Sequence, residues 1–211
     1  MSGACRSRSS WRPEAGNLAV IGVLAIQGDY REHRRVLDKL GADVAEVRLS
    51  HQLDDIDGLI IPGGESTTII QLIDIYKMRS KLRKRILDDG MPTWGTCAGM
   101  IAMADKLREH RPEPLQLMDI DVSRNAFGRQ VDSFESDLEI KHLEGPPFRG
   151  VFIRAPVVDR VGEEVRVLAA LEDGRPVAVM QRNMLATAFH PELTEDTRLH
   201  ELFLEMVNSA V

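Results

Sequence analysis

Ala19-Val20-Ile21-Gly22-Val23-Leu24-Ala25-Ile26 is a continuous apolar run that ends in Gln27-Gly28. A run without alternating polar residues is typical of a strand buried on both faces. The polar segment that follows, residues 30–40, has apolar side chains at helical spacing and ends at Gly41, a common stop signal. The fold therefore begins with a buried strand followed by an amphipathic helix.

The same alternation continues along the chain. We expect strands at residues 43–49, 58–61 and 92–95, and helices at residues 67–89, with a break near Tyr76, and 98–106. Further strands are expected around residues 118–122, 150–154, 165–171, 176–181 and 184–189, and a last helix at 197–207, with Leu199, Leu202, Phe203 and Met206 facing the core. This order predicts an α/β fold with a mostly parallel sheet and antiparallel additions in the second half.

Composition is that of an ordinary globular protein. Of 211 residues, 43% are hydrophobic and 28% charged, and the net charge of -6 argues against a generic nucleic-acid-binding surface. The basic run at residues 77–85 is either a solvated helix face or a docking surface for a protein partner. We expect residues 1–17, rich in Arg, Ser and Gly, to be disordered, and residues 18–211 to form one domain.

The two cysteines, Cys5 and Cys97, lie in unlike surroundings, the first polar and the second apolar. A structural disulfide is therefore not expected, and a reducing, cytoplasmic setting fits best. No apolar run reaches the length that crosses a membrane, and the first residues lack the apolar core of a secretory signal.

Cys97 lies between glycines at Gly95 and Gly99, where a strand passes into a helix. This is the pattern of a nucleophile elbow, in which glycines let the backbone reverse without clashes. A thiol at a helix N-terminus meets unpaired N–H groups and the positive end of the dipole, which favour the thiolate. The alternative, a buried and inert cysteine, is the usual role of a lone cysteine in an apolar setting.

A thiolate nucleophile needs a base, and His190 is the best candidate among six histidines. It follows the apolar strand 184–189, whereas most of the others lie in polar segments typical of solvated surface histidines. If the chain is extended here, His190 and Glu192 face the same side and Pro191 fixes the backbone between them. A carboxylate beside the ring would orient it, as in a catalytic triad.

The segment Pro62-Gly63-Gly64-Glu65-Ser66-Thr67 follows the strand at residues 58–61. Ligand sites of open α/β sheets lie at such strand ends. The backbone N–H of Gly64, together with that of Ala98, could hold a developing oxyanion. A tight turn with Ser66 or Thr67 capping the next helix is an equally good interpretation, and the two are compatible.

Together these segments resemble the class I (triad) glutamine amidotransferases, and within them the glutaminase subunits of pyridoxal 5′-phosphate synthase. The resemblance runs from Ile21 to the C-terminus. Its pieces are Gly22–Gly28, Pro62–Thr67, Trp94–Met100, Arg124–Gln130, Val151–Pro156 and Phe189–Leu193. The elbow and His-Pro-Glu fit any triad amidotransferase, whereas Gly-Gly-Glu-Ser, Arg-Asn-x-Phe-Gly-Arg-Gln and Phe-Ile-Arg-Ala-Pro point to this subfamily.

The resemblance implies a three-layer, flavodoxin-like sheet with helices on both faces and a glutaminase that hydrolyses L-glutamine to glutamate and ammonia. It implies an ammonia-accepting synthase subunit as partner, no cofactor and no metal. The implied triad is Cys97, His190 and Glu192. The implied glutamine contacts are Gly64, Glu65, Ser66, Arg124, Ile153 and Arg154, although Arg124 and Arg154 could also be structural ion pairs.

Two other functions are weighed. One is a triad glutaminase of another pathway, such as histidine, purine or guanine nucleotide synthesis. A pull-down that shows which synthase the chain binds would separate these pathways. The other is a non-enzymatic, redox-sensing α/β protein with an elbow cysteine. Such a protein would not need the downstream His-Pro-Glu and would form no glutamyl thioester.

Overall fold

The structure, a computed structural model, describes residues 19–124 and 133–210. The expectation of a disordered tail at residues 1–17 therefore concerns residues outside the described ranges, as does the Asn125–Gln130 part of the subfamily segment. Within those ranges, no helix combines the length and apolar composition needed to cross a bilayer.

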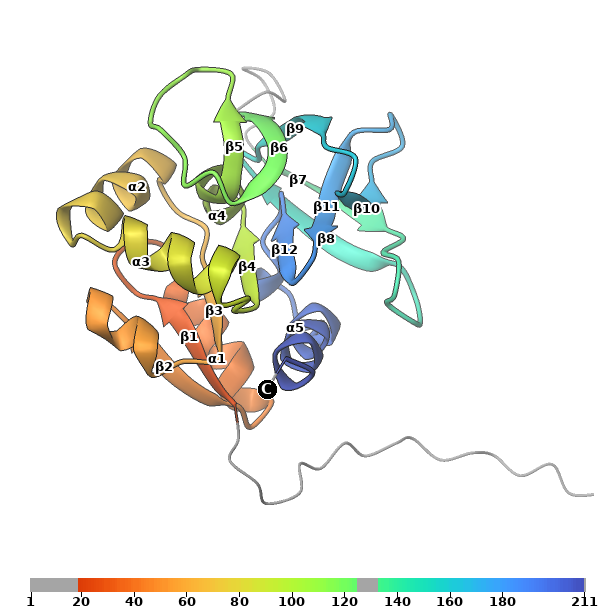
Figure 1. The fold of residues 1–211 in the computed structure, drawn as a ribbon. Helices are drawn as coiled ribbons and strands as arrows, with labels where there is room; N and C mark the ends of the chain where they lie inside the picture. The colour runs from red at the N-terminus through yellow and green to blue at the C-terminus, as the bar shows by residue number, and fades with distance from the viewer. Residues whose placement is uncertain (1–18, 125–132, 211) are drawn as a thin grey trace, which may run out of the picture.

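A seven-stranded sheet forms the centre of the molecule (Figure 1), in the order β10-β11-β12-β4-β3-β1-β2. The strands β12, β4, β3, β1 and β2 are mutually parallel, and β11 and β10 extend the sheet in antiparallel pairing. The bounds are β1 (Val20–Leu24), β2 (Asp43–Val47), β3 (Gly58–Ile61), β4 (Thr93–Thr96), β10 (Arg166–Ala170), β11 (Pro176–Gln181) and β12 (Met184–Thr187). The predicted parallel core with antiparallel additions is confirmed.

Helices cover both faces of this sheet (Figure 1). They are α1 (Tyr30–Lys39), α2 (Ser66–Ile75), α4 (Ala98–Met103) and α5 (Arg198–Asn208). Alternate residues of β4 show the layering, because successive strand side chains point to opposite faces. Trp94 packs against Phe203 of α5, and Gly95 lies against Gly99 of α4. The three-layer α/β architecture is confirmed.

The helix expected at residues 98–106 is too long, which corrects the prediction. It ends at Met103, because Ala104 has ψ 155 and starts the strand β5 (Ala104–Leu107). This strand lies in a separate three-stranded sheet with β6 (Met118–Ser123) and β9 (Val157–Val161), and β7 (Ser133–Leu138) pairs with β8 (Phe148–Ile153). Strands β7 and β9 were not expected from the sequence.

The break expected near Tyr76 is present. After α2 come α3 (Arg79–Arg83) and the π-helical turn η2 (Lys84–Asp88), which lie near the short helix η1 (Ser50–Asp54). The arginines of the basic run donate to backbone carbonyls: Arg79 to Pro114, Arg83 to Leu115 and Gln116, and Arg85 to Leu53 and Ile56. The prediction of a solvated helix face is therefore wrong for these arginines, which fasten neighbouring loops.

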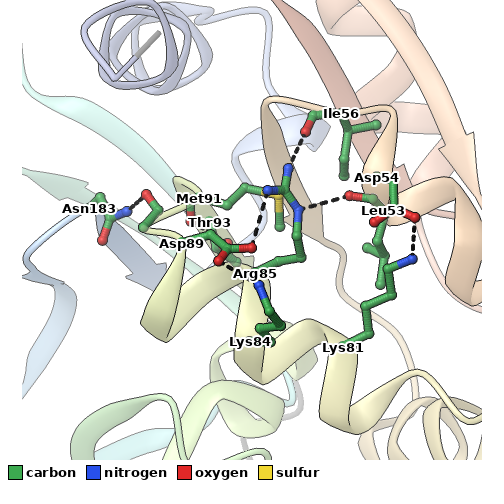
Figure 2. A network of polar contacts seen from close by, with 11 residues as sticks. Leu53, Asp54, Ile56, Lys81, Lys84, Arg85, Asp89, Met91, Thr93 and Asn183 are labelled. Atoms are coloured by element: carbon green, nitrogen blue, oxygen red, sulfur yellow. Dashed lines mark hydrogen bonds and ion pairs between the residues drawn. The ribbon is translucent and has the colours of Figure 1, made fainter.

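Replacing Arg85 should destabilise the protein. Figure 2 shows its guanidinium between η2 and the segment after η1, where Nε lies 3.0 Å from the Leu53 oxygen and Nη2 lies 2.8 Å from the Ile56 oxygen. Arg85→Leu leaves both carbonyls without this donor, and we expect a loss of about 2 kcal/mol in unfolding free energy. Urea denaturation measures it.

Lys84→Ala is the matched control. Its ammonium is mostly exposed and pairs with Asp89, so its loss should cost under about 1 kcal/mol. Equal losses in the two variants would contradict a structural role for the Arg85 contacts.

Candidate active site

The residues of the candidate site follow the ends of three neighbouring strands. Because β3, β4 and β12 are adjacent and parallel, their carboxyl ends meet at one edge of the sheet. The segment after β3 carries Gly63 and Gly64, β4 leads into Cys97, and β12 leads toward His190. Residues more than ninety positions apart in the sequence are brought together by this topology alone.

Cys97 sits on a sharp turn between β4 and α4, with φ 48 and ψ -103. Its N–H donates to the Thr187 carbonyl at 2.8 Å, which fixes the turn against β12. The thiol points to the Ile153 carbonyl at 3.7 Å, and the residue is 6% exposed. This strained backbone is what a nucleophile elbow requires, and it is unusual for a residue other than glycine.

The glycine at position 99 is required by close packing. A Cβ placed there would overlap with the carbonyl oxygen of Ile61, which is backbone and cannot move aside. We therefore expect Gly99→Ala to cost about 1–3 kcal/mol of stability and to displace the elbow. Thermal unfolding and a crystal structure of the variant measure the two effects.

Gly22→Ala is the matched control for that substitution. The added methyl would meet the tip of the Ile56 side chain, which can rotate away. Its cost should therefore be smaller, and an equal cost in both variants would contradict the argument from backbone contact.

His190 and Glu192 are in contact, but not through an extended backbone. His190 has φ -106 and ψ 87, and Pro191–Leu193 form a short 3-10 helix, η3. The tight turn brings Nδ1 of His190 to 2.7 Å from Oε1 of Glu192. The predicted pair is present, whereas the predicted strand geometry between the two residues is wrong. Proline at the first helical position explains the turn.

The electrostatics of His190 reflect its neighbours. Burial lowers the pKa of His190, but hydrogen bonds with Cys97 and Glu192 raise it more, to about 10. Burial also raises the pKa of the Glu192 carboxyl, against the opposing effect of His190. At neutral pH the site therefore favours an imidazolium between sulfur and carboxylate. Such a group can donate a proton to a leaving amine.

Two histidines assigned to solvated surroundings are buried, which corrects the sequence interpretation. His33 of α1 and His200 of α5 are both 0% exposed, and Nδ1 of His33 lies 3.0 Å from Nε2 of His200. His33 also reaches Oε2 of Glu192, at 3.3 Å. A signal existed in the sequence: His33 shares the helical face of Val36 and Leu37, both buried.

Asp29 is a further site residue that the sequence analysis missed. Its Oδ2 lies 3.5 Å from Nδ1 of His190, so two carboxylates face the same nitrogen. Its position just after the first strand places it at the same sheet edge, which could have indicated it. Among the described residues, Asp29, His190 and Glu192 have possible ligand atoms within 4.8 Å of one another. The hydrogen bond of His190 to Glu192 uses the same atoms, and the absence of a metal stays an expectation.

The loop after β3 is held by the segment that follows β1 and by the end of β4. Glu65 N–H donates to Oε1 of Gln27 at 2.9 Å, and Gly63 N–H donates to Oγ1 of Thr96 at 3.0 Å. Gly64 between them has φ +149, where a side chain would be strained. The loop is thus fixed beside Cys97, and Ala98 opens α4 with an N–H that has no intrahelical acceptor.

Glu65, and not Ser66 or Thr67, caps α2. Its carboxylate accepts from the N–H groups of Thr67 and Thr68, at 3.1 Å and 2.6 Å. The capping prediction is therefore wrong as to the residue, because the N-cap position is occupied by Glu65, whose side chain reaches the N–H groups two and three residues further along. Ser66 is buried at the first position of the helix.

The other expected glutamine contacts lie around the same edge. Ile153, at the end of β8, turns its carbonyl to the thiol while its side chain is 39% exposed. Arg154 follows with φ 45 and is exposed. Arg124 donates to Thr67 Oγ1 at 3.0 Å and lies 3.9 Å from Glu109, which partly supports the ion-pair alternative. Its Nε is buried without a hydrogen bond among the described residues.

Comparison with known proteins places this geometry in a family. The family model described as "SNO glutamine amidotransferase family" matches residues 23–209. The chain is similar to "Pyridoxal 5'-phosphate synthase subunit PdxT" of Roseiflexus castenholzii, with 53% identity over 188 residues, covering 88% of this chain and 99% of the relative. The protein of that name in Rhodococcus opacus is 51% identical over 196 residues, covering 89% and 96%. A solved structure titled "Crystal structure of glutamine amidotransferase" superposes with TM-score 0.84 at 49% identity, covering 89% of this chain and 98% of that one.

Proposed function

The chain belongs to the SNO glutamine amidotransferase family, and from this premise we propose that it is the glutaminase subunit of a pyridoxal 5′-phosphate synthase. The relatives cited above are named as pyridoxal 5′-phosphate synthase subunits, at 51–53% identity, and the matching family model is that of glutamine amidotransferases. Within this function, Cys97 is the nucleophile, His190 the acid and base, and Glu192 the residue that orients His190. The observation that carries the assignment is the 2.7 Å contact of His190 with Glu192 at the sheet edge that also holds Cys97, whose thiol raises the pKa of His190.

The chemistry proceeds in two steps. The sulfur of Cys97 attacks the side-chain amide carbon of glutamine, and the carbonyl oxygen becomes an oxyanion held by the N–H groups of Gly64 and Ala98. His190 gives its proton to the amide nitrogen, which leaves as ammonia. Water then gives a proton to His190 and attacks the γ-glutamyl thioester, releasing glutamate and the thiol.

Substrate recognition uses residues around the same edge. The guanidinium of Arg124 suits the α-carboxylate of glutamine, and its buried Nε supports this role. Glu65 contributes through its backbone and through the helix that it caps, since Thr67 and Thr68 occupy its carboxylate. We assign Ser66, Ile153 and Arg154 to the remaining contacts with the substrate.

The partner is the subunit that consumes ammonia. Ammonia released into neutral water becomes ammonium, which is no nucleophile, so a biosynthetic glutaminase needs a shielded path to its acceptor. The exposed side chains of Ile153 and Leu193, 39% and 44% accessible, adjoin the site and suit a covering subunit. Because the site depends on a free thiol, we place the complex in the reducing cytoplasm.

The test is ammonia release from L-glutamine, measured with and without the pyridoxal phosphate synthase subunit. We expect turnover that is low in the isolated chain and rises when this partner is added. Activation by a synthase of another pathway instead, in a pull-down followed by the same assay, would favour the alternative glutaminase. Failure of a glutamine-analogue electrophile to label Cys97 with partner present would favour a non-enzymatic role.

A further inference from the structure

Two buried histidines lie beneath the triad and have no part in the mechanism above. His33 comes from α1 and His200 from α5, and Trp94 of β4 packs edge-on against both rings. The chain of contacts runs from His200 to His33 at 3.0 Å, and from Nε2 of His33 to Oε2 of Glu192 at 3.3 Å. His200, His33 and Glu192 thus form a buried series of polar contacts that ends at the carboxylate bound to His190.

Both rings are neutral. Burial lowers the pKa of His200 to about 3. Burial, and then the neighbouring His200 and His190, lower the pKa of His33 well below its ordinary value. A neutral imidazole carries one N–H and one acceptor nitrogen, so each ring has two possible tautomers. The neighbouring atoms decide between them.

In the first arrangement, His200 Nε2–H donates to Nδ1 of His33. Nε2–H of His33 is then the donor in the 3.1 Å hydrogen bond with Oγ1 of Thr96, and Oε2 of Glu192 lies 3.3 Å from the same nitrogen. Every N–H then has an acceptor. Two acceptor atoms of this cluster have no hydrogen bond among the described residues: Nδ1 of His200, which carries a lone pair here, and Oε2 of Glu192, which lies 3.3 Å from Nε2 of His33.

In the opposite arrangement, Nδ1–H of His33 donates to His200. The proton of His200 must then sit on its Nδ1, where no acceptor is present in the described chain. The lone pair of His33 Nε2 would also face the carboxylate oxygen of Glu192. A buried N–H without an acceptor and two opposed lone pairs both cost free energy. The first arrangement is therefore favoured.

We propose that His33 is a positioning residue for glutamine hydrolysis, which donates from Nε2 to Oε2 of Glu192, and that His200 fixes the tautomer that allows this. Oε1 of Glu192 is held by His190, and Oε2, which has no other hydrogen bond among the described residues, lies 3.3 Å from the His33 nitrogen that would hold it. A carboxylate held in this way cannot rotate away from the imidazole when the proton on His190 moves. The inference rests on the glutaminase function proposed above.

The first test compares His33→Gln with His33→Leu in the full chain with its synthase partner. The glutamine side chain can place an N–H where Nε2 of His33 lies, whereas leucine fills space only. We expect kcat of ammonia release to fall about tenfold or more in His33→Leu, with KM little changed, and His33→Gln to recover most of it. Equal kcat values in the wild type and His33→Leu would overturn the proposal.

Phe203→Leu is the control for lost packing. Phe203 contacts the same Trp94 ring but has no polar contact with the triad, so this variant should lose stability and keep its kcat. A fall in kcat that follows stability alone across the three variants would show a merely structural role for His33.

A second measurement needs no variant and no activity. Nitrogen NMR of the histidine rings in the wild-type chain distinguishes the protonated from the unprotonated nitrogen. We expect His33 and His200 both to carry the proton on Nε2 between pH 6 and 8. A proton on Nδ1 of His33 would overturn the proposal. Absence of ammonia release by the wild type with partner would instead contradict the proposed function and leave this measurement standing.

Discussion

Cys97→Ala should abolish glutamine hydrolysis, with a fall in turnover of at least about 10⁴-fold in the presence of the synthase partner. Without the sulfur, no thioester forms, and water would have to attack the amide directly. The elbow itself should survive, because alanine takes the place of a residue already held at φ 48 by the hydrogen bond from its N–H to Thr187. The measurement is ammonia release under saturating glutamine.

Cys97→Ser is the matched variant for this experiment. It keeps the size and a polar atom at the same place, but a hydroxyl is a far weaker nucleophile than a thiolate. Both variants should still bind glutamine, and neither should be labelled by a glutamine-analogue electrophile. Turnover near that of the wild type in either variant would eliminate Cys97 as the nucleophile.

His190 supplies a second readout for the same substitution. Cys97 is one of the groups that raise the pKa of His190 to about 10, in opposition to burial. Removing the thiol should therefore move this pKa downward, toward neutral pH, and an NMR titration of the ring follows the change. An inert, uncoupled cysteine would leave the titration of His190 unchanged in Cys97→Ala.

Much of this site was predictable because it lies at strand ends. The apolar runs at residues 58–61 and 184–189 could be recognised as buried strands, and parallel neighbours must end at one edge of the sheet. Gly64 and His190 follow such strands within three residues, and Cys97 was indicated by the glycines on either side of it at the end of another strand. These three residues lie close together only because β3, β4 and β12 are adjacent in the sheet. The family resemblance implied this strand order, whereas no local sequence pattern indicates it.

The residues behind the site were not predictable in the same way. His33 and His200 lie on the packing faces of two helices 167 positions apart, and only the layering of α1 and α5 on one face makes them meet. The neighbourhood of His33 is polar, which pointed to solvent, whereas His200 stands between the apolar core residues Leu199 and Leu202 and was still not recognised as buried. The N-cap of α2 was also missed, because a serine and a threonine follow Glu65 and either is a more usual cap.

Glu192→Gln should lower kcat by about 10²- to 10³-fold with little change in KM. The side chain keeps its shape but loses the charge that raises the pKa of His190. The loss should be smaller than that of Cys97→Ala, because Asp29 is a second carboxylate at 3.5 Å from the same nitrogen. Steady-state kinetics with the synthase partner measure it, and Glu192→Gln with Asp29→Asn should lose more activity than either variant alone.

The size of this effect depends on which way the new amide turns. If His33 donates from Nε2, the amide oxygen of Gln must face His33, and its NH₂ group must face Nδ1 of His190. Nδ1 of His190 must then be an acceptor, so the single proton of the neutral ring lies on Nε2. Nε2 is the nitrogen that should take a proton from water, so His190 can no longer act as the base.

Glu192→Asp, which keeps the negative charge on a shorter side chain, should retain more activity than Glu192→Gln. In His33→Leu the amide is free to turn, so adding Glu192→Gln there should cost less than it does in the wild type. Additive losses would mean that His33 does not act through Glu192.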